Sequence, residues 1–348
     1  MSILAIGTMS GTSLDGMDIA LCRFSKPGDK WDYEIIKTQT VTYSNLWIEK
    51  LRNAHLMCAS EFLLLHNEYG EFTGKRILEF IDGMEIPQLI ASHGHTIFHQ
   101  PDKKFTFQLG NGASIAAVTG ISTITDFRNL DVALGGQGAP LVPVGDQLLF
   151  GEFDYCLNLG GFANISFEKK GDRIAFDICP ANIILNALAL QKGDLYDNDG
   201  QLGASGTVNE TLLKKLNNLD YYFQSSPKSL GREWSDNYVI PRLTESGISI
   251  ENQAATFYEH IVDQISKAVN SPGKLLITGG GAKNRFLINK LRSKTLCQII
   301  LPGQELIDYK EALIFAFLGV LAFKGEVNIR SSVTGACRDH IGGIIYHV

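Results

Sequence analysis

The sequence predicts an α/β protein with two lobes, and two observations lead to this prediction. Stretches with the spacing of amphipathic helices alternate with short apolar runs that are typical of strands. A strand followed by a glycine-rich loop also occurs three times, at residues 3–18, 154–166 and 274–285. With 348 residues, the chain is long enough for two lobes that each have a hydrophobic core.

The first glycine-rich loop joins two apolar runs, residues 3–6 and 19–24. Glycines let the backbone approach an anion, hydroxyl groups donate hydrogen bonds to its oxygens, and Asp15 and Asp18 can orient Mg²⁺ or its water shell. An ordinary hairpin loop has about two to five residues. Because the polar segment is longer, it favours phosphate binding over a plain turn at Asp15-Gly16. The predicted contacts are Gly11, Thr12, Ser13, Leu14, Asp15, Gly16, Met17 and Asp18.

The other two loops repeat this design. The second follows the apolar run 155–159, and the third lies between a predicted strand at 274–278 and a helical pattern at 286–294. Glycines after a strand favour close approach of the backbone to a ligand at the edge of a sheet, although a tight strand-to-helix turn explains the third loop equally well. Together the three loops predict two lobes with a nucleotide between them. The additional contacts predicted are Gly160, Gly161, Gly279, Gly280 and Gly281.

The segments between the loops supply the remaining elements. Helical spacing of apolar residues occurs at 47–51, 60–80 and 252–269, and the apolar run 312–323 is typical of a buried helix. Strands are predicted at 89–92 and 122–126. No low-complexity linker is present, so we expect crossing segments near 128–150 and 308–312 to form a hinge. The expected lobes are residues 1–135 plus 312–348 and residues 136–311.

Composition and charge narrow the function classes. A net charge of −6 without runs of Lys and Arg argues against nucleic-acid binding. Six cysteines without a C-x-x-C pair suit a reducing compartment and predict no zinc site or other protein-held metal site. The longest apolar run is shorter than the about 17 residues that span a membrane, and the start lacks the pattern of a secretion signal. We therefore expect a cytoplasmic enzyme without membrane partners.

Several sequence blocks together resemble one family. They occur in order at residues 7–18, 92–96, 126–128, 135–143, 158–161, 176–177, 278–281 and 332–336. From residue 5 to about residue 346 the chain resembles the anhydro-N-acetylmuramic acid kinases. The resemblance implies an actin-like, ribonuclease H-like sugar kinase with two lobes that uses ATP and Mg²⁺. It further implies opening of the anhydro ring of 1,6-anhydro-N-acetylmuramic acid with phosphorylation of O6. The products would be N-acetylmuramic acid 6-phosphate and ADP, in peptidoglycan recycling.

The resemblance implies that Asp177 is the catalytic base. The family places an aspartate after the hairpin of its second lobe, and Phe176-Asp177 occupies this place. Water must lose a proton as it opens the acetal, and a carboxylate of raised proton affinity can accept that proton. The alternative is an aspartate that caps the helix expected after Pro180, since Asp and Pro both favour helix starts.

The resemblance also implies residues that bind the sugar. An arginine suits a carboxylate because it donates two parallel hydrogen bonds. For His93 and His95 the alternative is a structural role, because histidines that close a strand more often form structural hydrogen bonds. For Glu311 the alternative is a favourable interaction with the helix dipole at a helix start. The predicted substrate contacts are His95, Thr96, Asp126, Arg128 and Glu311.

The chain departs from the family pattern near the base. Cys179 and Ala181 stand where glycines are usual, and Asn111 stands where aspartate is frequent, which puts substrate fit and turnover in question. The possibility that the protein is a kinase for another hexosamine therefore stays open. A chaperone-like ATPase of the actin-like superfamily is the alternative from another class, but the chain ends at Val348 without room for a peptide-binding module. The sequence leaves open whether the protein is a homodimer.

Overall fold

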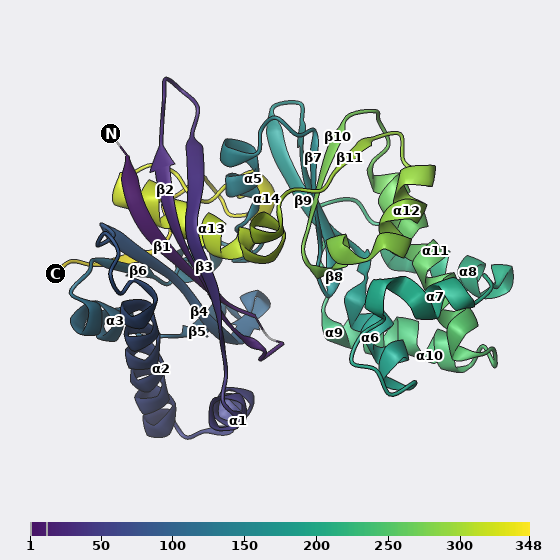
Figure 1. Ribbon diagram of the computed structural model, residues 1–348, viewed down its shortest axis with the longest axis horizontal. Coiled ribbons are helices and arrows are strands. Elements are labelled where there is room, and N and C mark those ends of the chain that lie inside the picture. The colour runs from purple at the N-terminus through teal and green to yellow at the C-terminus, as the bar shows by residue number, and fades with distance from the viewer. Residues whose placement is uncertain (1, 12) are drawn as a thin grey trace. The chain divides into compact units, whose positions relative to one another are not determined.

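The computed structural model describes residues 2–11 and 13–348, which form two compact α/β units. Unit 1 comprises the residues up to 149 together with 309–348, and unit 2 comprises 150–308. Each unit contains a sheet of its own (Figure 1). The α/β class is thus confirmed. The chain passes between the units at 149–150 and 308–309, inside the two segments expected to cross, and residues 136–149 group with unit 1.

The sheet of unit 1 is mixed, with strand order β12-β6-β4-β1-β2-β3 and with β5 paired to β4. β1, β2 and β3 are antiparallel neighbours, whereas β4 runs parallel to both β1 and β6. The strands are β1 Ile3–Ser10, β2 Gly16–Ser25, β3 Asp32–Thr42, β4 Leu89–Gln100, β5 Phe105–Leu109, β6 Thr123–Thr125 and β12 Ile344–Tyr346. β4 is longer than the strand predicted at 89–92 because its second half pairs with β5.

One helix of unit 1 lies directly on the sheet. A Cβ added to Gly7 of β1 would lie 1.8 Å from the carbonyl oxygen of Ala312, and one on Gly319 would lie 2.5 Å from Cβ of Ala91. Only glycine permits this approach, which buries the apolar run of α13 as predicted. The helices are α1 Asn45–Asn53, α2 Ala59–Phe80, α3 Gly112–Thr119, α4 Asn129–Ala133, α5 Pro143–Leu149, α13 Gln304–Phe323 and α14 Ser331–Thr334.

The sheet of unit 2 has strand order β11-β10-β7-β8-β9. β7, β8 and β9 form an antiparallel meander, and β10 runs parallel to β7 and β11. The strands are β7 Tyr155–Leu159, β8 Phe162–Lys169, β9 Asp172–Pro180, β10 Lys274–Thr278 and β11 Gln298–Ile300. The predicted second and third strand-and-loop designs are therefore present.

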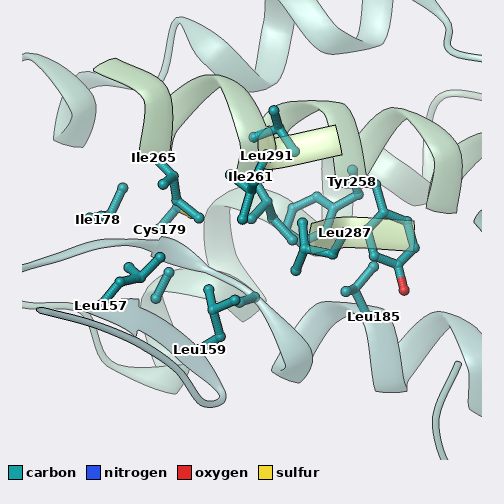
Figure 2. Packing of buried hydrophobic residues seen from close by; sticks show 14 of the residues in the cluster. Leu157, Leu159, Ile178, Cys179, Leu185, Tyr258, Ile261, Ile265, Leu287 and Leu291 are labelled. Carbon is teal, nitrogen blue, oxygen red and sulfur yellow. The ribbon is translucent and has the colours of Figure 1, made fainter. Parts of the chain in front are cut away.

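Helices α11 and α12 pack on this sheet and enclose the core of unit 2 (Figure 2). The side chain of Cys179 lies in that core with Leu157 of β7 and Ile265 of α11. Burial of each such aliphatic side chain contributes about 1.5–3 kcal/mol. Cys179 thus has a packing role, beside the question that it raises about substrate fit. The helices are α6 Asn182–Leu190, α7 Gln201–Ser205, α8 Glu210–Asn217, α9 Arg232–Trp234, α10 Ile240–Thr244, α11 Ile250–Ala268 and α12 Arg285–Lys294.

Among the described residues, no helix combines the length and the apolar character that crossing a membrane would require.

Candidate active site

The first glycine-rich loop is shorter in the structure than the sequence suggested. β1 continues to Ser10 and β2 begins at Gly16, so only residues 11–15 connect the strands. That length lies within the range of an ordinary hairpin, and the argument from loop length was therefore wrong. Gly16, Met17 and Asp18 belong to β2, and Thr12 lies outside the described residues.

The two glycines at the ends of this loop differ in their surroundings. A Cβ on Gly16 would lie 2.7 Å from the carbonyl oxygen of Val41, so packing against β3 accounts for this glycine. A Cβ on Gly11 would meet no atom closer than 3.4 Å. Gly11 is therefore the position at which a ligand, rather than the protein, can require glycine. Beside it, Ser13 Oγ donates to Asp15 Oδ1 over 2.7 Å.

His95 lies in β4 beside the end of β1. Its Nδ1 is 2.8 Å from Ser10 Oγ, and the side chain is only 3% exposed. Burial lowers the pKa of His95 to about 4, so the ring is neutral at neutral pH. The next residue, Thr96, accepts a hydrogen bond from Gln108 Nε2 of β5 at 3.5 Å.

Arg128 is held by two acceptors. Its Nε donates to His93 Nε2 over 2.9 Å, and its Nη1 donates to the carbonyl oxygen of Gly138 over 2.5 Å. Burial lowers the pKa of Arg128 to about 10, which leaves it cationic. The Nη2 group makes no hydrogen bond within the described part of the chain, so it is available to an acidic ligand. His93 thus has the structural role that was the alternative for the histidines.

Asp126 and Glu311 lie in the same unit. Asp126 Oδ1 accepts hydrogen bonds from the backbone and side-chain nitrogens of Asn129, at 3.3 and 2.7 Å, and thereby holds the start of α4. Glu311 follows a kink at Tyr309, where φ is −115°. Burial raises the pKa of Glu311, and the nearby Arg128 cation opposes this shift. Their electrostatic coupling places the two side chains in one neighbourhood.

Asp177 lies in β9, in unit 2. Its Oδ2 accepts a hydrogen bond from the backbone N–H of Leu230 over 2.9 Å. The backbone of Asp177 is held as well, since its N–H donates to the carbonyl oxygen of Lys228 and its carbonyl oxygen accepts from Tyr221 Oη over 2.6 Å. Oδ1 has no hydrogen-bond partner among the described residues. Burial raises the pKa of Asp177 to about 6.

The alternative role of Asp177 as a helix cap is wrong. The residue at the cap of α6 is Ala181. The first N–H groups of α6 are instead bound by the second glycine-rich turn, because the carbonyl oxygen of Gly161 accepts from Ala181 and Ile183 and that of Gly160 accepts from Asn182. The carbonyl groups of this turn therefore dock the helix, while their Cα atoms stay open, with nothing nearer than 3.6 Å to an added Cβ.

The three glycines after β10 have two different surroundings. A Cβ on Gly279 or Gly281 would lie within 3.0 Å of Leu159, and Gly279 has a φ of +82°, so packing against β7 requires both. Gly280 has nothing within 4 Å. It lines a cavity of about 650 Å³ in unit 2, together with Tyr196 and Asn284 among others. Gly280 is therefore the glycine of this loop that faces a potential ligand.

No cluster of three or more His, Cys, Asp or Glu side chains arranged for a metal occurs in residues 2–11 and 13–348. Mg²⁺ bound with a nucleotide commonly takes only one or two carboxylates and keeps several waters. Asp18 is a half-buried carboxylate beside Thr40, which donates to it over 2.6 Å. Its oxygen donors fit this preference of Mg²⁺.

Sequence reasoning missed the segment that holds Asp177. Tyr221, Lys228 and Leu230 lie 44–53 residues after Asp177, and no motif marked them. The ammonium of Lys228 lies 4.5 Å from the centre of the Tyr221 ring and donates to the Tyr221 carbonyl oxygen. Asn111, by contrast, has a local role, because its Oδ1 accepts from Ala113 N and caps α3.

Comparisons with known proteins cover nearly the whole chain. The family model described as anhydro-N-acetylmuramic acid kinase matches residues 3–348. A curated relative of that name from Pseudomonas fluorescens (strain Pf0-1) is 34% identical and covers 99% of both chains. Another from Shewanella sediminis (strain HAW-EB3) is 35% identical and covers 98% of both.

Two solved structures of lower identity also align. Component A of (R)-2-hydroxyglutaryl-CoA dehydratase from Acidaminococcus fermentans has a TM-score of 0.46 at 13% identity, covering 90% of this chain and 96% of that one. A ROK family glucokinase from Streptomyces griseus, in complex with glucose and AMPPNP, has a TM-score of 0.43 at 11% identity, covering 90% and 98%.

Proposed function

We propose that Asp177 is the base that activates water in this chain, which belongs to the anhydro-N-acetylmuramic acid kinase family. The family membership makes the protein a phosphotransferase that acts on an alcohol group of a sugar. The observation that supports the role of Asp177 is its hydrogen bonding. One carboxylate oxygen is fixed by the N–H of Leu230, and the other has no partner among the described residues.

The substrate that we propose is 1,6-anhydro-N-acetylmuramic acid, whose O6 is bonded to C1 and carries no proton. Water therefore adds at C1 as the C1–O6 bond breaks, and its proton passes to the free oxygen of Asp177. O6 takes the γ-phosphoryl group of ATP as the bond to the β-phosphate oxygen breaks, so ADP leaves. Asp177 then returns its proton to solvent. A pKa of about 6 keeps the base largely ionised at neutral pH.

We assign the nucleotide to four open glycine positions and one cavity. Gly11, Gly160, Gly161 and Gly280 are not required by protein packing at their Cα atoms, so close approach of a phosphate or a nucleoside accounts for them. The cavity beside Gly280 is large enough for a nucleoside. Mg²⁺ would neutralise charge on the phosphates, and Asp18, with Asp15 nearby, would hold its water shell.

The sugar contacts that we propose lie in unit 1. Arg128 keeps Nη2 free for the lactyl carboxylate, because His93 and Gly138 take up Nε and one hydrogen of Nη1. His95 and Thr96 would hydrogen-bond sugar oxygens. Asp126 and Glu311 add carboxylate acceptors for sugar hydroxyl groups.

An ADP-release assay tests the reaction. We expect ADP release in the presence of 1,6-anhydro-N-acetylmuramic acid and little without a sugar. N-acetylmuramic acid, which has a free O6 hydroxyl group, is the comparison substrate. Equal rates with both sugars would indicate an ordinary hexosamine kinase, and equal rates without sugar would indicate an ATPase of another kind.

The nucleotide assignment needs its own test. Gly280→Val places a side chain into the space that we assign to ATP, so the affinity for a non-hydrolysable ATP analogue, measured by calorimetry, falls by a factor of about 10 or more. Gly303→Val is the matched control, because Gly303 is also open and does not line the cavity. Unchanged affinity in Gly280→Val would contradict the assignment.

A further inference from the structure

The guanidinium group of Arg128 is supported from two sides that differ in structure. Nε donates to His93 in β4, a strand with paired neighbours on both sides. Nη1 donates to the carbonyl oxygen of Gly138, which lies in the loop between α4 and α5. Loops are generally more mobile than the strands of a sheet. The contacts that hold the loop at Gly138 therefore decide how firmly Arg128 is oriented.

The turn of residues 135–138 lies against the side chain of Asp131. Oδ2 of Asp131 accepts from the N–H of Gly138 over 2.7 Å, and its backbone carbonyl oxygen accepts from the N–H of Gly136 over 2.8 Å. A Cβ added to Gly136 would lie 2.2 Å from Oδ2, so only glycine allows this close approach. Gly138 thus gives its N–H to Asp131 and its carbonyl oxygen to Arg128. One residue connects the two side chains.

Helix α14 holds the other side of this turn. Thr334 Oγ1 donates to Asp131 Oδ1 over 2.6 Å, since a carboxylate oxygen can only accept. The carbonyl oxygen of Thr334 accepts from the N–H of Gln137 over 2.8 Å. Asp131 is 0% exposed and Thr334 is 1% exposed, and His340 Nε2 lies 3.6 Å from the same Oδ1. The turn is therefore fixed between α4 and α14, which are far apart in the sequence.

We propose that Asp131 is a positioning residue for Arg128, because it holds the turn of residues 135–138 at the place where the Gly138 carbonyl oxygen fixes Nη1 and leaves Nη2 to a carboxylate of the substrate. Asp131 is buried completely, so it acts on the sugar only through Arg128. The effect on substrate rests on the proposed function, in which Arg128 binds the lactyl carboxylate. The hydrogen bonds from Asp131 to Arg128 do not depend on that function.

The charge of Asp131 supports this role. Withdrawal of a guanidinium group from water is costly unless nearby groups compensate its charge. Burial lowers the pKa of Arg128 to about 10, and the negative charges of Glu311 and Asp131 oppose this shift. Asp131 thus stabilises the cation as well as the turn that orients it. Because its hydrogen bonds reach Arg128 through Gly138, the guanidinium group keeps Nη2 for a ligand.

Two substitutions of Asp131 test its effect on the sugar. Asp131→Ala removes both acceptor oxygens, so the turn loses its support and the KM for the sugar rises about 10-fold, as expected for one misplaced charge-assisted hydrogen bond. The KM for ATP stays unchanged. Asp131→Asn is the conservative variant, since its amide oxygen accepts from Gly138 and its amide nitrogen donates to Thr334, and it keeps the KM for the sugar within about 3-fold. An unchanged KM for the sugar in Asp131→Ala would overturn the proposal.

Thr334 provides a test that disturbs the core less. Thr334→Val retains the shape of the side chain and removes its hydroxyl group, and Thr334→Ser retains the hydroxyl group. We expect the KM for the sugar to rise about 5-fold in the first variant and to stay within about 2-fold in the second. If Asp131→Ala does not fold, this pair decides, and equal values in the two variants would overturn the proposal.

Nuclear magnetic resonance tests the positioning without the sugar. Full-length protein with ¹⁵N-labelled arginine is measured, and Arg128→Gln identifies the signals of Arg128. The hydrogen bond to Gly138 restrains rotation of the guanidinium group, so we expect resolved Nη hydrogens in the wild type and in Asp131→Asn, and averaged signals in Asp131→Ala. Averaged signals already in the wild type would overturn the proposal.

A double substitution separates this inference from the proposed function. Arg128→Gln should raise the KM for the sugar, and Asp131→Ala should add nothing in the Arg128→Gln background. A further 10-fold rise in the double variant would overturn the proposal, because Asp131 would then act by another route. An unchanged KM in Arg128→Gln would contradict the proposed sugar contact of Arg128, whereas the magnetic resonance result would still decide whether Asp131 positions it.

Discussion

Asp177 of unit 2 and His95 of unit 1 are two titratable groups on which burial acts in opposite directions. Withdrawal from water disfavours the charged form of each. For the carboxyl group this raises the pKa to about 6, and for the imidazole it lowers the pKa to about 4. At neutral pH His95 is therefore neutral, whereas Asp177 is still largely ionised because its raised pKa remains below 7.

The hydrogen bonds of the two groups support the base role that we propose for Asp177 and a different role for His95. The N–H of Leu230 donates to Asp177 and supports its ionised form, so the carboxylate exists near neutral pH and can accept a proton from water. His95 Nδ1 lies 2.8 Å from Ser10 Oγ, and no carboxylate among the described residues forms an ion pair with its ring. The comparison teaches that burial alone does not define a base.

The largest effect is expected at Asp177, the base that we propose. Asp177→Asn keeps the shape of the side chain and removes its ability to take a proton, so turnover falls by a factor of about 10² to 10⁴. ADP release in the presence of the sugar measures this. Asp172→Asn, an exposed carboxylate at the start of the same strand, is the matched control and stays active. Near-normal turnover of Asp177→Asn would contradict the base role of Asp177 and with it the functional difference from His95.

The pH dependence of kcat/KM separates the two groups. Protonated Asp177 cannot accept the proton of water, so kcat/KM falls about tenfold for each pH unit below about 6. This acidic limb of the pH profile should be retained in His95→Gln, because His95 does not titrate near pH 6. Loss of the limb in His95→Gln would assign the essential ionisation to the histidine instead.

Removal of one hydrogen-bond donor tests whether the N–H of Leu230 lowers the pKa of Asp177. Replacement of Leu230 by its 2-hydroxy acid converts the amide into an ester and deletes the N–H that supports the carboxylate. The limb of the pH profile then moves upward by about one pH unit. The same replacement at Ser229 is the control. A limb that stays in place would show that this contact does not tune the base.

The smallest effect concerns stability. Between pH 4 and 6 the unfolded chain loses the proton of this carboxyl group before the folded chain does, so ionisation of Asp177 lowers stability as the pH rises through this range. His95 acts in the opposite sense, because its contribution is lost as the pH falls from 6.5 towards 4.

Asp177→Asn should accordingly melt a few degrees higher than the wild type at pH 8 and lose this advantage near pH 4. Thermal unfolding at both values provides the measurement. Lower stability of the variant at pH 8 would contradict this expectation, because it would mean that the surroundings of Asp177 offset the cost of burying its charge.

The sequence was sufficient for features that depend on local pattern. The apolar spacing within α2 and α11 and the glycines after β10 identified these elements, and family blocks located Asp177. Loop length failed at residues 11–15, because strand pairing extends into a segment whose composition is typical of a turn. The carbonyl groups of Gly160 and Gly161 dock α6, a use that composition does not reveal.

Long-range hydrogen bonds account for the remaining features that the sequence did not predict. Ser10 and His95 are 85 positions apart, and Leu230 lies 53 positions from Asp177. No periodicity links residues at such separations, since the contacts arise only when strands and loops pack. The partners that set protonation therefore had to come from the structure.

A single turnover in ¹⁸O-labelled water tests the central claim, that Asp177 activates water for attack at C1, most directly. The reaction is quenched before the anomeric oxygen exchanges, and the sugar and its phosphate group are analysed by mass spectrometry. The account predicts label on C1 and none in the transferred phosphate, with no labelled product from Asp177→Asn on the same timescale. An unlabelled C1, or label in the phosphate, would contradict it.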